Sequence, residues 1–391
     1  MIRVGFLFEG GDAWLGGVNY LWNLLFAVGA KADRKLEPVL IAPQDAPLHG
    51  LDQITRVEIV RRQASPAPTV AARTMSRRVW GRDEVVARLC DQHRIDVLSH
   101  SGTFGWRMPV ATTPWIPDLQ HRRLPEFFSF SERRIRDYAV LHQLIEGDAV
   151  IVSSQAAAND CRRYYGPLAS RLDVLRFVSQ PRLDWASLPS TDSLRTELGV
   201  PERFFFLPNQ FWRHKNHAVV VEAMAIAKRR GNDVQVVLTG KAADYRAPDH
   251  YRRLMDRVSG LGLSQQFQHL GLVPFPQLMG LVRDSIAVIN PSLFEGWSTT
   301  VEESRSMGKA TILSDIDVHR EQALPDARYF AADDAESLAM ILEENWNHAV
   351  TNRDEARRVA AHAALPARTL GFALRYEAIV ERALSRRRLR R

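Results

Sequence analysis

The sequence predicts an α/β protein that contains two doubly wound parallel sheets. Short apolar segments alternate with amphipathic helical patterns along the chain, and strands that alternate with helices form parallel sheets. The chain has 391 residues, more than a single hydrophobic core usually serves, so two domains are expected. Because ligands of such folds bind outside the carboxyl ends of the strands, we expect the two sheets to face a common cleft.

The segments of strand length fall into two series, one for each expected sheet. The first lies at residues 3–8, 38–41, 57–60, 96–99, 113–116 and 149–152. The second lies at residues 204–207, 234–238, 267–270, 285–289 and 310–313. Helical patterns, with apolar residues three and four positions apart, lie between the strands at 18–28, 84–93, 132–144, 217–229 and 250–258.

These series place the first domain at residues 1–180 and the second at residues 201–365. Residues 181–200 are polar, contain two prolines, and form the expected linker. The remaining residues, 366–391, hold a helical pattern that can pack on either domain, including a return to the first, and end in a basic tail.

The composition is that of a soluble globular protein, with 46% hydrophobic and 25% charged residues. No apolar run approaches the roughly 20 residues that span a bilayer, and the N-terminus resembles a first strand more than a secretory signal. The two cysteines, Cys90 and Cys161, are too few for a disulfide scaffold and indicate a reducing cytosol. We therefore expect a cytoplasmic location.

The net charge of +7 favours anionic partners such as nucleotide phosphates, nucleic acid or acidic lipid. No zinc-finger spacing or RNA-recognition signature supports nucleic acid. The basic segment at residues 385–391 is either a solvated tail or a contact with the inner face of a membrane. Phenylalanines between arginine pairs offer a second membrane contact, although we prefer that they join the core. These residues are Arg122–Arg123, Phe127, Phe128, Phe130 and Arg133–Arg134.

The junction that follows the expected strand 285–289 holds more polar residues than a turn needs. Its sequence is NPSLFEGWSTTVEES, residues 290–304. Thr299 and Glu302 fit a capping box, in which Thr299 caps a helix and Glu302 bonds back to its amide. Gly308 fits the position just after the end of that helix. Glu302 thus has a structural role.

Glu303 lies four residues after Thr299, on the same face of this helix. The amides and dipole of a helix N-terminus favour phosphate, and a carboxylate one turn behind suits a ribose diol. Gly296 lets the backbone approach a ligand closely. The alternative is a solvated carboxylate that the helix dipole stabilises. The candidate nucleotide contacts here are Glu295, Gly296, Ser298, Thr299, Thr300 and Glu303.

Two further loops follow strands on the same expected edge. Lys215 precedes the helix 217–229, where its ammonium can reach a diphosphate or, alternatively, form a surface pair with a glutamate. Gly16 and Gly17 open the first helix and expose amides toward the cleft. They do not form Gly-x-Gly-x-x-Gly, so a nicotinamide dinucleotide is discounted.

The segment PSLFEGWSTTVEESRSMGKATILSD resembles the Glu-x7-Glu motif of retaining glycosyltransferases of the GT-B fold, particularly family 4, the glycosyl transferases group 1. The resemblance implies two Rossmann-like domains that face a cleft. It also implies that Glu303 holds the ribose, that Glu295 lies beside the transferred sugar and that Lys215 binds the diphosphate. The sequence departs from the family at Thr299–Thr300, where Leu-Pro is frequent, and at Asn209–Gln210, which replaces a phosphate-binding arginine. Asn209 becomes a candidate contact in its place.

Members of this family often carry a histidine near the sugar in the first domain. His121 and Asp118 are the preferred candidates here, and His100 is another. Pro117 occupies the position that best matches the family's histidine, so a structural role for each histidine remains an equal alternative.

The expected activity is transfer of a sugar from a nucleotide-diphosphate sugar to a hydroxyl of a sugar or lipid-linked glycan, with retention of configuration. The resemblance suggests surface polysaccharide or lipopolysaccharide synthesis. No cofactor and no metal are expected, because Asp315-Ile316-Asp317 comes too late in the chain to be the metal motif of the other major glycosyltransferase fold. The alternatives are a GT-B sugar-nucleotide epimerase and a non-catalytic protein that binds nucleic acid or membrane.

Overall fold

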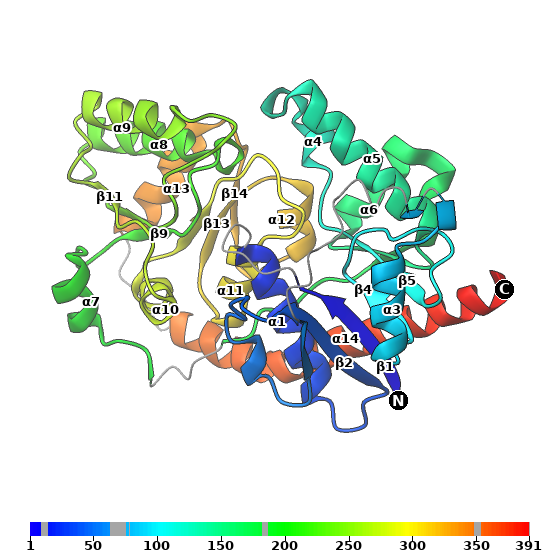
Figure 1. Ribbon diagram of the computed structural model, residues 1–391. Coiled ribbons are helices and arrows are strands. Elements are labelled where there is room, and N and C mark those ends of the chain that lie inside the picture. The colour runs from blue at the N-terminus through cyan, green and yellow to red at the C-terminus, as the bar shows by residue number, and fades with distance from the viewer. Residues whose placement is uncertain (9–14, 63–75, 78, 182–186, 348–352, 391) are drawn as a thin grey trace. The chain divides into compact units, whose positions relative to one another are not determined.

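The computed structural model describes residues 1–8, 15–62, 76–77, 79–181, 187–347 and 353–390. Its internal contacts divide the chain into two compact units (Figure 1). Unit 1 comprises Met1–Pro125, Ser129–Val178 and Ala367–Arg391, and unit 2 comprises Glu126–Phe128 and Ser179–Pro366. Each unit is built around its own parallel sheet, as the alternation of strands and helices predicts.

The main sheet of unit 1 has the strand order β3-β2-β1-β4-β5, and a smaller sheet has the order β6-β7-β8. All pairings are parallel. The strands are β1 (Ile2–Leu7), β2 (Leu36–Pro43), β3 (Glu58–Arg62), β4 (Val97–Ser99), β5 (Ala111–Thr113), β6 (Trp115–Ile116), β7 (Val150–Val152) and β8 (Leu172–Val174). The expected strand at 113–116 is therefore two strands in two sheets, and β8 was not expected.

Helices and short 3-10 turns connect these strands. They are α1 (Leu15–Ala30), η2 (Leu51–Gln53), α3 (Glu84–Gln92), α4 (Gln120–Arg123), η3 (Pro125–Phe127), α5 (Phe130–Glu146), α6 (Gln155–Tyr165) and η4 (Gly166–Arg171). α3 packs Val86 and Cys90 against Val39 of β2 and Leu98 of β4. Cys90 is thus a core residue, and burial raises the pKa of its thiol to about 12.

The last helix, α14 (Arg353–Arg390), is much longer than the expected segment 370–384. The division between the units falls at Pro366, inside this helix. Beyond it, Ile379 and Val380 are fully buried, and the Tyr376 hydroxyl donates to Ser99 Oγ at 2.7 Å. The sequence allows the C-terminal segment to pack on either domain. From Ala367 onward it packs within unit 1.

The basic end of α14 is not a freely solvated tail over the residues that the structure describes. Arg382 lies 2.6 Å from Asp173 Oδ1, and Arg390 lies 3.2 Å from the buried Asp148. Arg386 donates to the Asp148 carbonyl. These arginines hold α14 on the small sheet of unit 1.

The sheet of unit 2 has the order β11-β10-β9-β12-β13-β14. Its strands are β9 (Phe205–Leu207), β10 (Val236–Leu238), β11 (Phe267–His269), β12 (Val288–Asn290), β13 (Thr311–Ser314) and β14 (Arg328–Phe330). Its other elements are α7 (Thr191–Leu198), η6 (Arg213–Lys215), α8 (His217–Arg229), α9 (His250–Gly260), α10 (Phe275–Asp284), α11 (Thr299–Ser306), α12 (Asp317–Gln322) and α13 (Ala335–Asn347).

Alternate residues of the strands contribute to different cores of unit 2, because successive side chains of a strand point to opposite faces. Phe205 and Val236 face the core that α8, α9 and α13 cover. Phe206 and Val237 face the core that α7 and α10 cover. The segment 181–200, expected as a linker, therefore contains a helix that belongs to unit 2.

Candidate nucleotide-sugar site

The candidate site lies in unit 2, at the carboxyl ends of two neighbouring strands. β9 and β12 are adjacent and parallel, so the loops that follow them emerge at one edge of the sheet. Asn209 and Lys215 come from the loop after β9, and Glu295 comes from the loop after β12. Leu293 N donates to the His214 carbonyl at 2.8 Å and ties the two loops together. Residues far apart in the sequence thus meet here.

Lys215 and Glu295 form an ion pair at the centre of this edge. Lys215 Nζ lies 2.6 Å from Glu295 Oε1, and the side chains are 17% and 10% exposed. Burial alone would raise the pKa of Glu295, but the Lys215 ammonium, with smaller effects from His214 and His319, lowers it to about 2. Glu295 is therefore ionised at neutral pH.

A chain of polar side chains beneath this pair orients it. The Ser292 hydroxyl lies 2.7 Å from Glu295 Oε1 and 2.7 Å from Asn290 Oδ1. Asn209 Nδ2 donates to Asn290 Oδ1 at 3.3 Å, and Asn290 Nδ2 donates to Ser298 Oγ at 2.7 Å. These groups join the end of β12 to the start of α11.

α11 begins one residue earlier than the capping-box prediction requires. Its N-cap is Ser298, whose hydroxyl accepts from Val301 N at 3.3 Å, so the assignment of Thr299 as N-cap was wrong. Glu302 is buried, 3.8 Å from Arg305. Gly308 has φ 65° just after the C-cap, as predicted. The sequence does not distinguish Ser298 from Thr299 as the cap, because Ser and Thr are similarly good caps and the backbone geometry decides between them.

The other predicted contacts of the junction lie around the start of α11. Thr300 Oγ1 donates to Asn209 Oδ1 at 3.4 Å, and Glu303 is half-buried in the first turn and a half of the helix. Gly296 is in the loop between Glu295 and the N-cap. Asn209, which occupies the slot of the family's arginine, is buried and hydrogen-bonded within the site.

Buried histidines close to the pair were not predicted from the sequence. Burial, and then the charge of Lys215, lower the pKa of His214 to about 3. The pKa of His319 is lowered chiefly by burial, and its Nδ1 donates to the Ser314 carbonyl at 2.9 Å. Both are neutral at neutral pH, so the positive charge that Glu295 contacts is that of Lys215. The segment RHKNH could have drawn attention to His214, but nothing in the sequence indicates that it is buried.

The unit 1 candidates lie in separate surroundings. Gly16 and Gly17 are in the first turn of α1, while residues 9–14 of the same loop are outside the described residues. His100 has φ 50° and lies 2.8 Å from both Tyr20 Oη and Ser99 Oγ. Burial lowers the pKa of His100 to about 3, so it is a neutral residue within a polar cluster.

His121 and Asp118 hold local structure. His121 is buried, and its Nε2 lies 2.9 Å from Asp137 Oδ1. Tyr165 and Arg122 donate to the same oxygen at 2.8 and 2.6 Å. Asp118 Oδ1 accepts from the amide of Gln120, the first residue of the short helix α4, at 2.9 Å. These contacts fit the alternative interpretation of the sequence, in which His121 has a structural role.

Asp315 and Asp317 also have local roles. Arg320 donates two hydrogen bonds to the Asp315 carboxylate, at 2.6 and 2.7 Å, and Asp317 lies in the first turn of α12. Asp315 is therefore bonded to α12, the helix that Asp317 begins.

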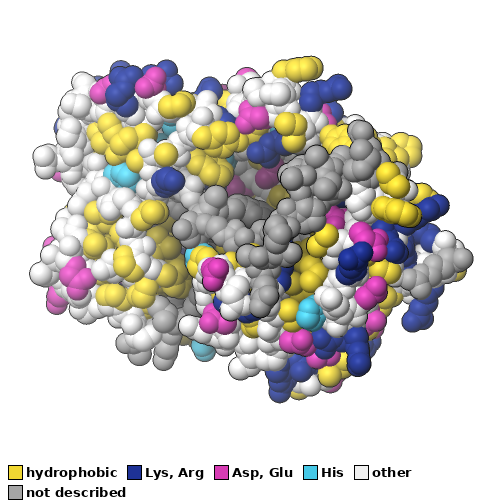
Figure 2. Space-filling view, in the orientation of Figure 1, with side chains coloured by type: hydrophobic (Ala, Val, Ile, Leu, Met, Phe, Trp, Pro, Cys, Tyr) yellow, Lys and Arg dark blue, Asp and Glu magenta, His cyan; other side chains and the backbone are white. Residues whose placement is uncertain are grey.

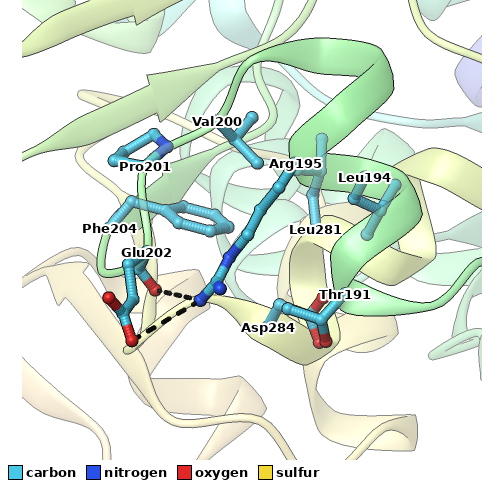
Figure 3. A pocket seen from close by; sticks show the side chains of 9 residues that line it. All are labelled: Thr191, Leu194, Arg195, Val200, Pro201, Glu202, Phe204, Leu281 and Asp284. Carbon is cyan, nitrogen blue, oxygen red and sulfur yellow. Dashed lines mark hydrogen bonds and ion pairs between the residues drawn. The ribbon is translucent and has the colours of Figure 1, made fainter.

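A pocket lies at the opposite end of the unit 2 sheet (Figure 3). It is lined by residues of α7 and α10 together with Phe204, which precedes β9, whereas Asn209 follows β9. Arg195 reaches toward Glu202 across it, with 3.8 Å between Nη2 and Oε1. None of the predicted nucleotide contacts lines this pocket.

Comparisons with known proteins agree with this fold. Residues 192–362 match the model of the family described as glycosyl transferases group 1. The structure resembles Anabaena HepE in complex with UDP and glucose, with a TM-score of 0.69, 17% identity, and coverage of 97% of this chain and 100% of that chain. It also resembles a glycosyltransferase from Rickettsia africae ESF-5, with a TM-score of 0.69, 16% identity and 98% coverage of both chains.

Parts of two curated glycosyltransferases are also similar to this chain. A D-inositol 3-phosphate glycosyltransferase from Arthrobacter sp. (strain FB24) is 28% identical over 43% of this chain and 41% of its own length. One from Paenarthrobacter aurescens (strain TC1) is 25% identical over 56% of this chain and 54% of its own length. The chain spans about half the length of the curated relatives it matches.

The fold class is GT-B. Within it, the segment that matches the glycosyl transferases group 1 family includes Lys215 and both glutamates of the Glu-x7-Glu motif.

Proposed function

We propose that the protein transfers a sugar from a nucleotide-diphosphate sugar to a hydroxyl acceptor, with retention of configuration. The observation that carries the proposal is the buried Lys215–Glu295 pair at the carboxyl edge of the unit 2 sheet, beside the start of α11. Ligands of open parallel sheets bind at this edge, and the family match covers the same residues. HepE, with the same fold, binds UDP and UDP-glucose, so UDP is the first nucleotide to test.

In this proposal Lys215 holds the diphosphate. Glu295 positions its ammonium. The neighbouring His214 and His319 are neutral and do not repel it. The backbone amides at the start of α11 add positive partial charge. Together they stabilise the negative charge that develops on the leaving diphosphate. The diphosphate oxygen then helps to deprotonate the acceptor hydroxyl, and no metal is required.

The two glutamates of the motif have different roles. Glu295, ionised and fixed by Lys215 and Ser292, lies beside the transferred sugar, where it accepts hydrogen bonds from sugar hydroxyls. Glu303, half-buried one turn into α11, accepts from the ribose diol. The proposed acceptors are sugars or lipid-linked glycans. We propose that the enzyme acts at the inner face of a membrane.

Lys215→Met tests the phosphate contact. Loss of a charged hydrogen bond costs about 1.5–3 kcal/mol, so the affinity for UDP should fall by tenfold or more in calorimetric titration while the affinity for uridine stays the same. Lys228→Met is the matched control, because Lys228 is a surface residue of α8 whose ammonium bonds to the Gly262 carbonyl and not to the candidate site. Unchanged UDP affinity in Lys215→Met would refute the assignment.

Glu303→Ala tests the ribose contact. Its affinity for UDP should fall by about tenfold, the effect of about 1.5 kcal/mol for a hydrogen bond to a charged group, and its affinity for 2′-deoxy-UDP should fall less. Glu302→Ala is the control, since Glu302 is buried beside Arg305 and its loss should lower stability instead. Equal UDP and deoxy-UDP losses would contradict the ribose role.

Product analysis distinguishes the two enzyme classes. Incubation of the enzyme with a UDP-sugar and a glycan acceptor should release UDP and form an α-linked product from an α-linked donor, as read by NMR. Conversion of the donor alone to an isomeric sugar would instead indicate an epimerase.

A further inference from the structure

We propose that the Nε2–H group of His214 donates a hydrogen bond to a hydroxyl of the transferred sugar, a role that rests on the proposed function. His214 lies in η6, immediately before Lys215. Its backbone carbonyl accepts from Leu293 N and so ties the loop after β9 to the loop after β12. The charges of Lys215 and Glu295 both act on its ring, which therefore lies close to the candidate site.

The imidazole of His214 is almost completely buried, but one of its nitrogens is open to a ligand. Little histidine surface appears on the face of the molecule that Figure 2 shows, and His214 itself is only 4% exposed. Its Nδ1 lies 3.4 Å from Arg246 Nη2. Its Nε2 has no hydrogen-bond partner among the residues that the structure describes, and it is not fully shielded from solvent. A small ligand can therefore reach Nε2.

The contact with Arg246 determines which nitrogen of His214 carries the proton. A guanidinium has only N–H donors, so Nδ1 accepts, and the single proton of the neutral ring lies on Nε2. Burial, together with the charge of Lys215, keeps the ring neutral. The Nε2–H group is thus a neutral donor in a fixed position.

Asp244 holds Arg246 in this position. Its carboxylate is completely buried, and the Arg246 side chain is 6% exposed. Arg246 Nε donates to Asp244 Oδ1 at 3.1 Å, and Arg246 Nη2 lies 3.4 Å from Oδ2. The same Oδ2 accepts from Arg213 N at 3.0 Å, at the start of η6. One carboxylate therefore fixes both the guanidinium and the backbone that carries His214.

Two other histidines of unit 2 show different patterns. Nδ1 of His269 lies 2.9 Å from Tyr251 Oη, and its Nε2 lies 2.9 Å from the Gly240 carbonyl oxygen, so both nitrogens are paired. Nε2 of His319 has no partner among the described residues, but it is fully buried and closed to a ligand. His214 differs from both, because its ring is held in place while an unpaired nitrogen stays accessible.

A neutral donor near a carboxylate fits a hydroxyl better than a phosphate. A hydroxyl both donates and accepts, so it can donate to the ionised Glu295 while it accepts from His214 Nε2. A phosphate oxygen only accepts, and the charge of Glu295 would repel it. In the proposed function the phosphates contact Lys215 and the amides of α11 instead. The partner of His214 is thus the sugar rather than the diphosphate.

A pair of amide substitutions tests this hydrogen bond by calorimetric titration. His214→Asn keeps an acceptor near Nδ1 for Arg246 but removes the donor at Nε2. It should bind UDP-glucose about fivefold more weakly than wild type, which corresponds to about 1 kcal/mol, the typical contribution of one hydrogen bond. Its affinity for UDP should equal that of wild type. The longer side chain of His214→Gln restores an N–H near Nε2 and should recover most of the affinity for UDP-glucose.

The matched control is His142→Asn. His142 lies in α5 of unit 1, where its Nδ1 is 2.8 Å from Glu146 Oε1, so this variant should bind both ligands as wild type does. Nitrogen-15 NMR of the imidazole tests the positioning role of Arg246, because a merely structural contact would not select a tautomer. The His214 signals, identified by their absence from His214→Asn, should show Nδ1 unprotonated and Nε2 protonated.

Three outcomes would overturn the proposal. They are wild-type affinity of His214→Asn for UDP-glucose, an equal loss of affinity for UDP and UDP-glucose in this variant, and an Nδ1–H tautomer of His214 in the wild type. Failure of the wild type to bind UDP at all would instead refute the proposed function, on which the role of His214 depends.

Discussion

Glu295 is the residue whose state the rest of the candidate site depends on. Its carboxylate is almost fully buried, a position that would favour the neutral acid if no positive charge were near. Lys215, 2.6 Å away, reverses this preference and holds the pKa at about 2. A buried charge pair of this kind adds little to stability compared with apolar residues. Its presence agrees with the ligand-binding role that we propose for it.

The low pKa of Glu295 makes a prediction about stability and pH. A carboxylate whose pKa is lowered on folding stabilises the protein above its ordinary pKa of 4.5, and this contribution is lost as the pH falls toward 2. The difference in free energy of unfolding between wild type and Glu295→Gln should therefore be constant above about pH 5.5 and shrink as the pH falls from 4.5. Urea unfolding of both proteins across this range measures it. A difference independent of pH would mean that Glu295 titrates normally.

At this scale the sequence pointed to residues of the family motif and of the strand ends, but not to the side chains that connect them. Lys215 and Glu295 were expected because the spacing of the motif and the order of the strands specify them. Asn290 and Ser292, which connect Glu295 to α11, carry no periodic signal. Their role arises from the meeting of two loops that are about eighty positions apart in the chain, as the separation of 81 residues between Asn209 and Asn290 illustrates.

At the scale of elements, α11 shows how a short helix can be fixed by its first residue. It has eight residues, so its own hydrogen bonds contribute little and isolated helices of this length are unstable. Ser298 caps it and also accepts from the Asn290 amide. The helix is thus attached to the strand that precedes it.

Ser298→Ala should lower the free energy of unfolding by about 2 kcal/mol, from a lost cap and a lost acceptor for a buried amide. Ser190→Ala is the matched control: Ser190 caps α7 by accepting from Ser193 N at 3.1 Å on an exposed surface, and its loss should cost about 1 kcal/mol. Urea unfolding compares the two. Equal losses would show that the contact with Asn290 adds no stability.

Most elements were predicted because their patterns are long or strongly apolar, as in α8, whose observed bounds equal the predicted ones. β8 and β14 were missed because each has three residues and includes charged positions, Asp173 and Arg328. Sheet pairing with a neighbouring strand determines such short strands. α7 was missed because its single buried apolar residue, Leu194, gives almost no helical period.

At the scale of the whole chain, the notable feature is that α14 contributes to both units. Its residues up to Pro366 belong to unit 2 and those from Ala367 belong to unit 1. Proline inside a helix removes a backbone hydrogen bond, and here it coincides with the change of unit. The sequence pattern at 370–384 detected only the part with a regular apolar face. The part before it is largely exposed and so lacks the periodicity that burial imposes.

The core of unit 1 should therefore depend on residues near the end of the chain. Ile379 is fully buried, whereas Leu374, on the same helix and in the same unit, is 47% exposed. Ile379→Asp places a charge in the core and should lower stability by about 4 kcal/mol or more, while Leu374→Asp should cost less than about 1 kcal/mol. Hydrogen exchange followed by mass spectrometry should locate the loss. In Ile379→Asp, amides of β1, β2 and β4 should exchange faster and those of β9, β10 and β12 should keep their protection, because Ile379 belongs to unit 1 alone. If both sets of strands lost protection together, the two units would unfold as one, and α14 would couple them rather than complete unit 1.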